Sequence, residues 1–477
     1  MSQASPRPSG VFSLLDTDLY KLTMQCAVLR WFPHAGVTYS FTNRTPDMKF
    51  TREAYEWLLQ QIEGLQNITL TKEELEYLRN NCPYLNSNYL TFLSEFRFKP
   101  SKQLDVTFEP LDDTGSKGDL GLFKIGIKGL WVETILYEIP LLALTSEAYF
   151  KFCDRDWDYH QQEEKAFRKG STLLEHGCQF SEFGTRRRRD HHTQDLVMKG
   201  LCQAAKQAYQ HGWKGKLTGT SNVYFAMKHG VEPVGTVAHE WYMGIGAITN
   251  NYEYANEIAL QYWLGCFGEG VLGIALTDTF GSPTFFDAFC RPVPVDPAAV
   301  RGPEDVHTPS GLTPSRLGFP SEVPSRTSEE HGDTARTYAQ IFTGIRQDSG
   351  DPIYFVKMAR DFYDKQGIKD KKTVVFSDSL NIDLCLDYKV VAEEAGFQPV
   401  FGVDDFKRLS DQKKSVPLNI VIKISSAGGR PAVKLSDNLG KNTGDSTTVV
   451  EVKKRLGYVE VDWENGDETR RWGAKEA

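Results

Sequence analysis

The stretch Val271-Leu-Gly-Ile-Ala-Leu276, which runs straight into Thr277-Asp278-Thr279, gives the clearest indication of the fold class. Its apolar part has the length of one buried strand, and its polar part begins where that strand would end. Helical segments separate similar pairs of an apolar run and a polar loop, at 216–219 and 220–222, 231–236 and 237–241, 343–345 and 346–351, and 373–376 and 377–379. Strands that alternate with helices predict a parallel sheet, and at this length an α/β barrel.

The polar loops after these strands hold candidate site residues. Loops that leave the carboxyl ends of barrel strands converge on one rim, so Asp278, Asp348 and Ser377 are expected near one another. Asp278 and Asp378 could cap turns, or they could bind ribose hydroxyls or Mg²⁺. The stretch Gly219-Thr220-Ser221-Asn222 precedes a helical segment, where it could cap the helix or hold phosphate and ribose oxygens.

His239 stands close to a hydroxyl and a carboxylate in the sequence. Thr236 lies shortly before it and Glu240 follows it directly. A carboxylate partner can fix the tautomer of an imidazole and raise its nucleophilicity. The other interpretation is a structural histidine, and the spacing does not identify an electrophile.

Four consecutive arginines, at 186–189, follow Gly184 and Thr185 in a chain whose formal net charge is −8. Guanidinium groups bind phosphate oxygens in a two-pronged fashion. A basic run can also be a solvated face or a nuclear-localisation tract. The overall field of an acidic protein does not attract anions, so any anionic ligand must be held by a local positive site. We interpret this run as that site.

Composition narrows the class of protein. The 477 residues exceed what one hydrophobic core usually serves, so two domains are expected. The acidic balance argues against nucleic-acid binding. Eight scattered cysteines without a C-x-x-C pair are typical of reduced thiols, and no stretch approaches the length of a membrane span. The sequence therefore predicts a cytoplasmic enzyme, with a nuclear location as the alternative.

Three parts are expected along the chain. Residues 1–143 mix helical segments with strand-like runs at 105–108, 122–127 and 130–132, and Thr71-Lys-Glu-Glu74 has the pattern of a capping box. Residues 144–417 carry the barrel pattern. It is interrupted at 291–337, where eight of the 22 prolines fall, and this insertion is predicted to be disordered. Residues 418–477 return to strands and are expected to pack back on the domains.

Taken together, these motifs resemble the nicotinate phosphoribosyltransferases, specifically their eukaryotic, fungal-type form. The resemblance covers nearly the whole chain apart from the proline-rich insertion. The stretches that carry it are Leu15-Asp-Thr-Asp-Leu-Tyr-Lys-Leu-Thr-Met24, Ser181 to Arg189, Gly219-Thr-Ser-Asn-Val223, Gly235-Thr-Val-Ala-His-Glu-Trp241, Ala275-Leu-Thr-Asp-Thr-Phe280, Arg346-Gln-Asp-Ser-Gly-Asp-Pro352 and Ser436-Asp-Asn-Leu-Gly-Lys441. It implies the type II phosphoribosyltransferase fold, in which an N-terminal α/β sandwich joins an irregular α/β barrel.

The resemblance also implies a reaction. The family makes nicotinate mononucleotide and pyrophosphate from nicotinate and 5-phosphoribosyl 1-pyrophosphate (PRPP), coupled to ATP hydrolysis. Mg²⁺ is expected, its ligands are left open, and no permanent organic cofactor is expected. By resemblance ATP phosphorylates His239, with Glu240 and Asp278 as its catalytic neighbours. Nicotinate is held by Tyr20, Thr236 and Arg346. Contacts to PRPP are expected from Arg186, Arg187, Arg188, Gly219, Thr220, Ser221, Asn222, Asp348 and Ser377.

One stretch departs from the family pattern. Family members carry a loop of the form F-G-I-G-T-x-x-T-N-D that receives the 5′-phosphate of PRPP, whereas this chain reads Phe401-Gly-Val-Asp-Asp-Phe406. Missing backbone and hydroxyl donors would weaken phosphate binding. The alternative function is therefore a catalytically impaired homologue that binds pyridine or phosphoribosyl ligands. A weaker alternative is a related enzyme that uses nicotinamide or quinolinate. A homodimer is also open, because some relatives build the pocket between two subunits.

Overall fold

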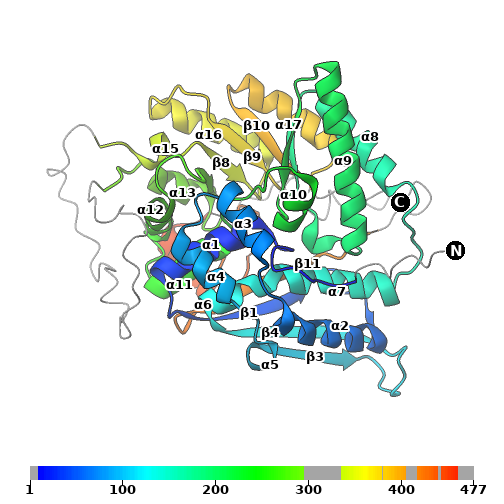
Figure 1. Cartoon of the computed structure of the whole chain (residues 1–477). Helices are drawn as coiled ribbons and strands as arrows, with labels where there is room; N and C mark the ends of the chain where they lie inside the picture. The colour runs from blue at the N-terminus through cyan, green and yellow to red at the C-terminus, as the bar shows by residue number, and fades with distance from the viewer. Residues whose placement is uncertain (1–8, 295–334, 379, 404–415, 439–441, 460–477) are drawn as a thin grey trace, which may run out of the picture.

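The computed structural model describes residues 9–294, 335–378, 380–403, 416–438 and 442–459 (Figure 1). Their strands form two sheets of six strands each. One sheet is antiparallel and the other is parallel, and Figure 1 shows the antiparallel sheet below the parallel one. This mixed architecture confirms the predicted α/β fold class.

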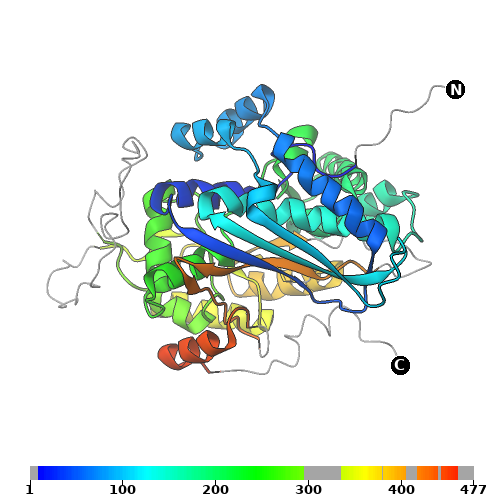
Figure 2. The same cartoon turned by 90° about the horizontal axis from the view of Figure 1, so that it is seen from below.

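The antiparallel sheet joins segments from both ends of the chain. Its strand order is β12-β11-β1-β4-β2, with β3 also paired to β4. The strands are β1 (Gly36–Asn43), β2 (Phe50–Thr51), β3 (Leu104–Pro110), β4 (Leu120–Leu130), β11 (Ile420–Ala427) and β12 (Arg430–Pro431). β11 pairs with β1 from Val37↔Ala427 to Asn43↔Ile420, and Figure 2 shows the two strands side by side. The strand predicted near the end of the chain is therefore present, and it completes a sheet that starts at residue 36.

Alternation along β4 builds one apolar face. Phe123, Ile125 and Ile127 are buried there, as expected for a strand with one covered face. The ring of Phe123 stacks on Phe50 with centroids 4.0 Å apart and lies 5.8 Å from Tyr55 of α2. This face is thus covered by helices of the N-terminal region.

The helices of this region are α1 (Leu19–Trp31), α2 (Arg52–Gly64), α3 (Lys72–Asn81), α4 (Ser87–Glu95), α5 (Pro100–Gln103), α6 (Trp131–Thr134) and α7 (Glu138–Phe152). Short 3₁₀ turns lie at η1 (Leu65–Asn67) and η2 (Ile135–Tyr137). The capping box at Thr71 and Glu74 is confirmed at the start of α3. The strand predicted at 130–132 is wrong, because the chain leaves β4 after Leu130. The Trp131 amide then donates to the carbonyl of Ala35, and its fully buried ring begins α6.

The parallel sheet has the order β6-β5-β10-β9-β8-β7. Its strands are β5 (Gln179–Glu182), β6 (Lys216–Thr220), β7 (Ile274–Leu276), β8 (Gly344–Gln347), β9 (Thr373–Phe376) and β10 (Gln398–Val403). The strands predicted around 216–219, 271–276, 343–345 and 373–376 are confirmed. Phe180, Phe376 and Phe401 are fully buried on neighbouring strands, which explains the apolar runs.

An irregular segment at 231–238 lies between the two edge strands β6 and β7. Pro233 forms a single parallel bridge with Thr220, and the Val234 amide donates to the Thr220 carbonyl at 2.9 Å. On the opposite edge, Thr236 Oγ1 donates to the Ile274 carbonyl at 3.3 Å. The segment predicted as strand-like at 231–236 is thus no regular strand, since Pro233 has no amide proton to donate. It nevertheless links both edges, which makes the barrel irregular.

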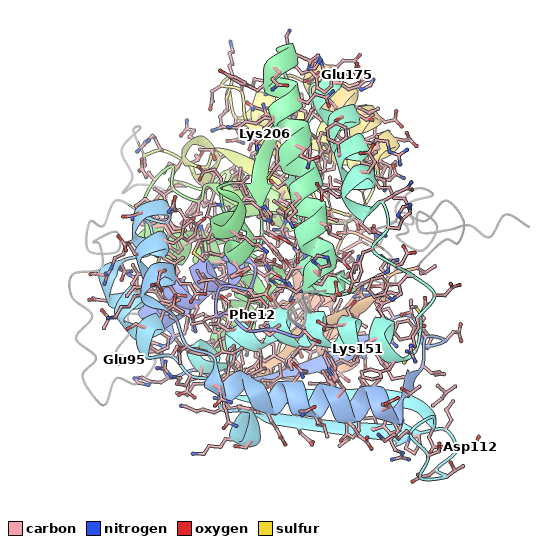
Figure 3. The ribbon with its side chains drawn as sticks, turned by 45° about the vertical axis from the view of Figure 1, so that its right-hand side comes forward. Phe12, Glu95, Asp112, Lys151, Glu175 and Lys206 are labelled. Carbon is pink, nitrogen blue, oxygen red and sulfur yellow. The ribbon has the colours of Figure 1, made fainter. Side chains whose placement is uncertain are left out.

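Helices surround this sheet: α8 (Gln162–Glu175), α9 (His191–His211), α10 (Val223–His229), α11 (His239–Thr249), α12 (Ala255–Phe267), α13 (Ser282–Phe289), α15 (Tyr338–Ile341), α16 (Pro352–Lys365) and α17 (Ile382–Glu394), with a 3₁₀ turn η3 (Thr185–Arg187) after β5. Figure 3 shows α8 and α9 side by side, with Glu175 and Lys206 labelled on them. A Cβ at Gly200 would come within 2.2 Å of the Glu163 carbonyl oxygen, so the close approach of these helices requires glycine.

Most of the predicted insertion at 291–337 falls outside the described residues, so its predicted disorder stays a prediction. Its two ends are described, and they pair. Pro292 and Thr337 form an antiparallel bridge, and the Val293 amide donates to the Arg336 carbonyl at 2.9 Å. The segment therefore leaves and re-enters the barrel at one point. Beyond β12, α18 (Ser446–Leu456) is the last described helix. None of the helices in the described ranges is long and apolar enough to span a bilayer.

Candidate active site

A cavity of about 180 Å³ lies at the carboxyl ends of the parallel strands, and β11 of the antiparallel sheet also lines it. Of the predicted site residues it is lined by Tyr20, Arg186, Arg187, His239, Glu240, Arg346, Asp348 and Ser377, and by the further candidate Asp378. The others stand outside its lining, namely Arg188, Gly219, Thr220, Ser221, Asn222, Thr236 and Asp278. These residues follow several different strands, and their convergence on one rim follows from the parallel topology.

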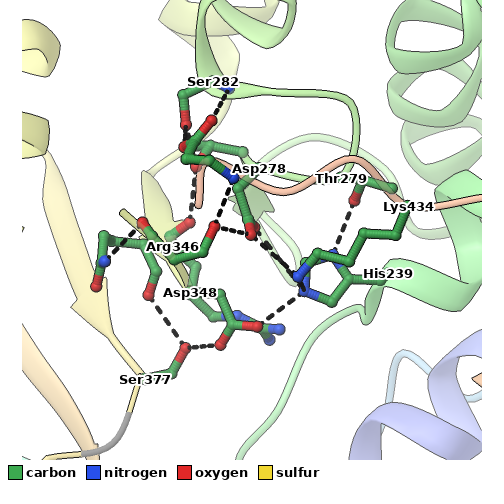
Figure 4. Close-up of polar contacts among 12 residues, drawn as sticks. His239, Asp278, Thr279, Ser282, Arg346, Asp348, Ser377 and Lys434 are labelled. Carbon is green, nitrogen blue, oxygen red and sulfur yellow. Dashed lines mark hydrogen bonds and ion pairs between the residues drawn. The ribbon is translucent and has the colours of Figure 1, made fainter. Parts of the chain in front are cut away.

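His239 is the first residue of α11 and is buried (Figure 4). Its Nδ1 lies 3.0 Å from Thr279 Oγ1, and its Nε2 lies 2.8 Å from Asp348 Oδ2 and 2.9 Å from Lys434 Nζ. Burial and the charge of Lys434 lower the pKa of His239 to about 4, against the opposite effect of Asp278 and Asp348. The imidazole is therefore neutral at pH 7 and retains a lone pair.

Asp348 is held from two sides. Ser377 Oγ donates to its Oδ1 at 2.6 Å, and His239 contacts its other oxygen. Burial alone would raise the pKa of Asp348, but the charge of Arg346 and the contact with His239 bring that pKa well below its usual range. This carboxylate is thus ionised at pH 7 and is the partner that orients the imidazole.

Asp278 lies near His239, in the loop that follows β7. Its Oδ2 lies 3.1 Å from Lys434 Nζ and accepts a hydrogen bond from Ser349 Oγ. Its Oδ1 is buried without a hydrogen-bond partner among the described residues and lies 3.8 Å from His239 Nε2. Burial would raise the pKa of Asp278, but its neighbours, above all the charge of Lys434, outweigh burial and lower it. A buried carboxylate of this kind needs the neighbouring ammonium group.

These residues also form a potential metal-ligand group. One ligand atom each from His239, Asp278 and Asp348 lies within 4.8 Å of the others. However, the ammonium group of Lys434 contacts both His239 and Asp278, so a positive charge already occupies this group. Mg²⁺ favours six oxygen ligands in octahedral geometry. The arrangement therefore does not fit a resident Mg²⁺.

Glu240 faces away from His239, contrary to its predicted place beside the imidazole. It accepts hydrogen bonds from Tyr39 OH at 2.5 Å and Trp131 Nε1 at 2.7 Å, and it pairs with buried Lys21. Successive residues of an α-helix project about 100° apart, so neighbours in sequence face different surroundings. The carboxylate that contacts His239 comes instead from Asp348, in the loop that follows β8.

The four consecutive arginines have separate environments. Arg186 and Arg187 line the cavity, and Arg187 also lies 3.4 Å from Asn419 Oδ1. Arg189 lies over the Phe150 ring, at 5.1 Å. The 3₁₀ turn η3 ends at Arg187 and the backbone is extended at Arg188, so the run changes conformation part-way and its side chains point in different directions.

Arg188 departs from its predicted role as a phosphate ligand. It is fully buried, and its two terminal nitrogens bind the two carboxylate oxygens of Asp16. Arg188 also donates to Gln194 Oε1 at 3.2 Å. It therefore fixes the segment before α1 to the barrel, and the structure does not bring it to the cavity.

The stretch at 219–222 also serves the scaffold. Asn222 caps α10 by accepting a hydrogen bond from the Phe225 amide. Thr220 Oγ1 donates to Glu182 Oε2 at 2.7 Å, and Ser221 Oγ donates to Asp18 Oδ1 at 2.8 Å. The capping interpretation thus describes Asn222, and the predicted phosphate contacts of this stretch find no support in the cavity lining.

Two aromatic residues line the cavity together with Arg346. They are Tyr20 and Phe183. Arg346 donates to the Val237 carbonyl at 2.9 Å, and its Nε is buried without a hydrogen-bond partner among the described residues. Gly235 has φ +144°, and a Cβ there would lie 3.2 Å from the Tyr20 amide nitrogen, so glycine lets α1 approach the barrel. The predicted residue Thr236 accepts a hydrogen bond from Thr23 through its carbonyl and belongs to that junction.

Comparison with known proteins shows the family to which the chain belongs. The model of the nicotinate phosphoribosyltransferase (NAPRTase) N-terminal domain matches residues 15–146, and the model of the nicotinate phosphoribosyltransferase (NAPRTase) family matches residues 178–294 and 325–460. The chain belongs to the nicotinate phosphoribosyltransferase family. Residues 295–324, within the proline-rich insertion, fall between the two matched parts of that family model.

Similar nicotinate phosphoribosyltransferases match nearly the whole chain. The nicotinate phosphoribosyltransferase of Saccharomyces cerevisiae is 42% identical over 470 residues, which cover 96% of this chain and 98% of that protein. A crystal structure from Saccharomyces cerevisiae matches with a TM-score of 0.81 and 41% identity, over 95% of this chain and 100% of that chain. The nicotinate phosphoribosyltransferase structure from Porphyromonas gingivalis matches with a TM-score of 0.75 and 30% identity, over 94% and 100% of the two chains. The predicted type II phosphoribosyltransferase fold is thereby confirmed.

Sequence reasoning missed five charged residues of this cavity, including Glu138. The other four that line it are Arg44, Lys423, Lys434 and Asp18. Burial, with the charges of Lys434 and Arg44, lowers the pKa of Lys423 to about 7. Burial raises the pKa of Asp18 to about 6. Asp18 lies within a stretch that carried the family resemblance, whereas a lone lysine in an apolar strand gives no comparable signal.

The stretch Phe401–Phe406 is only partly described. Gly402 lines the cavity and Val403 ends β10, but the residues from 404 onward fall outside the described ranges. The expected loss of the phosphate-binding loop therefore stays a prediction.

Proposed function

We propose that this chain transfers the phosphoribosyl group of PRPP to nicotinate, giving nicotinate mononucleotide and pyrophosphate, and that ATP hydrolysis is coupled to the transfer through a phosphorylated His239. Family membership supports the transfer. The observation that carries the full proposal is that a neutral, buried imidazole shares one cavity with a cluster of cations and two aromatic rings.

The cations suit the leaving group. In the transfer, the bond between C1 of the ribose and pyrophosphate breaks with its electron pair on pyrophosphate, and the ring nitrogen of nicotinate forms a new bond to C1. Six basic side chains of the cavity, Arg44, Arg186, Arg187, Arg346, Lys423 and Lys434, can neutralise the phosphates and the nicotinate carboxylate. Holding both reactants in one cavity also removes much of the entropic barrier.

The nicotinate subsite is proposed at Tyr20, Phe183 and Arg346. The two rings offer faces for the flat pyridine ring. Arg346 contributes a buried Nε–H that has no hydrogen-bond partner within the part of the chain that the structure describes, and an ionised carboxylate is the acceptor that such a donor lacks. This subsite favours nicotinate over its uncharged amide, and that argues against the nicotinamide alternative.

The ATP-dependent step is proposed at His239. A ring nitrogen attacks the γ-phosphorus of ATP, the bond to the ADP oxygen breaks, and ADP leaves with the electron pair. Water later cleaves the phosphohistidine to inorganic phosphate. The lowered pKa of His239 supplies the neutral, nucleophilic form, and Asp348 holds the ring. Mg²⁺ is proposed to enter with PRPP and ATP as part of those substrates, because the His239 group does not fit a resident ion.

Purified protein with nicotinate, PRPP, Mg²⁺ and ATP tests the proposal. We expect nicotinate mononucleotide and pyrophosphate in equal amounts, with product formation increased by ATP. Quinolinate or nicotinamide in place of nicotinate should give far less product. Retained binding of nicotinate or PRPP without any product would instead support the catalytically impaired homologue.

A further inference from the structure

The segment 432–438 crosses the two loops that follow β7 and β8. The Leu435 amide donates to the Thr279 carbonyl at 2.8 Å, on the first loop. On the second loop, the Asp437 amide donates to Ser349 Oγ at 3.0 Å, and the Gly350 amide donates to Asn438 Oδ1 at 2.6 Å. The segment therefore connects both loops that carry the carboxylates near His239.

Lys434 projects from this segment into the active site (Figure 4). Its Nζ lies 2.9 Å from His239 Nε2 and 3.1 Å from Asp278 Oδ2, and the residue is buried. Its backbone pairs with Thr443 through two hydrogen bonds of 2.9 Å. The position of this ammonium group thus depends on how residues 432–438 are held.

Ser436, between Lys434 and Asp437, has an unfavourable conformation. Its φ is +67°, in the left-handed region that residues other than glycine rarely adopt, and its buried Oγ has no hydrogen-bond partner among the described residues. Such a conformation persists only where surrounding contacts impose it, and it is concentrated at functional sites. Some contact near Ser436 must therefore hold the backbone.

Two contacts do so: the Tyr458 hydroxyl donates to the Ser436 carbonyl at 2.6 Å, and the neighbouring Asp437 binds Ser282. Asp437 Oδ1 accepts a hydrogen bond from the Ser282 amide at 2.8 Å, and its Oδ2 accepts one from Ser282 Oγ at 2.5 Å. Ser282 is the first residue of α13, and the N-cap position is Gly281, which has no side chain to cap the helix. Asp437 thus binds α13 from a distant part of the chain, and it does not line the cavity.

We propose that Asp437 is a positioning residue, which anchors the segment 432–438 to Ser282 and so holds Lys434 against His239 and Asp278. The inference rests on the proposed function, because His239 and Lys434 act there on phosphates. Loss of the anchor would let Ser436 relax and Lys434 withdraw. Asp278 would then lose its cation, and His239 would lose a neighbouring charge. Small displacements of such groups cause large losses of rate.

Two variants and a matched control test the anchor. Asp437→Ala removes both bonds to Ser282, and Ser282→Ala removes one of them. Asp445→Ala is the control: Asp445 also caps a helix of the C-terminal region, by accepting a hydrogen bond from the Thr448 amide at 2.8 Å, but it is exposed.

The first measurement needs no activity. Acetylation of Lys434 by an amine-specific reagent is followed by peptide mass spectrometry. We expect the labelling rate to rise at least tenfold in Asp437→Ala and less in Ser282→Ala, and to stay unchanged in Asp445→Ala. If Asp437→Ala does not fold, Ser282→Ala decides. If Lys434 is acetylated no faster in the folded variants than in the wild type, the proposal is wrong.

The second measurement asks whether Asp437 acts through Lys434. We expect Asp437→Ala to lower kcat with little change in KM for nicotinate, and to cause no further loss in a Lys434→Gln background. Losses that multiply in the double variant would mean a separate structural role and would contradict the inference. If the wild type forms no nicotinate mononucleotide, the proposed function fails, while the labelling experiment still decides whether the anchor exists.

Discussion

Arg188 binds Asp16 through both carboxylate oxygens, at 2.7 and 2.6 Å, and neither side chain is exposed to solvent. Removing one partner of a buried ion pair leaves the other charge uncompensated. Arg188→Ala should therefore lower the free energy of unfolding by about 3–5 kcal/mol in urea denaturation. Arg187→Ala, in the same arginine run, should lower it by much less. Equal losses for the two variants would contradict the assignment of Arg188 to the scaffold.

Arg346 should determine the choice between acid and amide. A hydrogen bond to a charged group contributes about 2 kcal/mol, so Arg346→Ala should weaken nicotinate binding by roughly thirtyfold. Nicotinamide binding, measured in the same calorimetric titration, should change little. Arg346→Lys keeps the charge and serves as the control. An equal loss for both ligands would rule out a carboxylate contact.

His239→Ala should abolish phosphate incorporation from γ-labelled ATP. Because burial and Lys434 lower the pKa of His239 to about 4, its neutral form dominates at every pH well above that value. Labelling of the wild type should consequently stay level between pH 5.5 and 8, roughly one unit or more above that pKa. A decline centred near pH 6.5 would show that the imidazole titrates as an exposed histidine does.

Lys423 should make PRPP binding depend on pH. Its pKa is lowered to about 7, so the ammonium form is present below that value and is lost as the pH rises through it. kcat/KM for PRPP should therefore fall above pH 7. Lys423→Arg keeps a positive charge throughout this pH range and should make kcat/KM for PRPP nearly independent of pH. A wild-type profile that Lys423→Arg leaves unchanged would exclude Lys423 as the titrating group.

A single chain should suffice for catalysis. Tyr20, Arg346 and His239 line one cavity within one polypeptide. Specific activity should thus stay constant on dilution through the range in which sedimentation shows any dimer to dissociate. A proportional fall in activity with the dimer fraction would instead show that a second subunit completes the site.

The sequence predicted those parts of the site that depend on local pattern. Apolar runs followed by polar residues located β7, β8 and β9, and the parallel topology then brings Asp348 and Ser377 to His239. The direction of each arginine in the run at 186–189 could not be predicted, because a 3₁₀ turn and the distant Asp16 decide it.

Contacts between segments that lie far apart in the chain could not be predicted from local sequence patterns either. Lys423 enters the cavity only because β11 pairs with β1, and Lys434 does so only because the segment 432–438 crosses two loops. Neither lysine has a local signal that separates it from a surface lysine. Glu240 shows the opposite error, since proximity in sequence suggested a contact with His239 that the helix geometry prevents.

The pairing of β1 with β11 also has a consequence for synthesis on the ribosome. Thr38 and Ser425 are hydrogen-bonded neighbours separated by 387 residues. Throughout most of translation the edge of β1 that β11 will cover stays open, and an open strand edge invites aggregation. A nascent chain of this protein should therefore need chaperone protection until its final segments emerge, and a premature stop before Lys423 should yield a product that can neither close its first sheet nor complete its catalytic pocket.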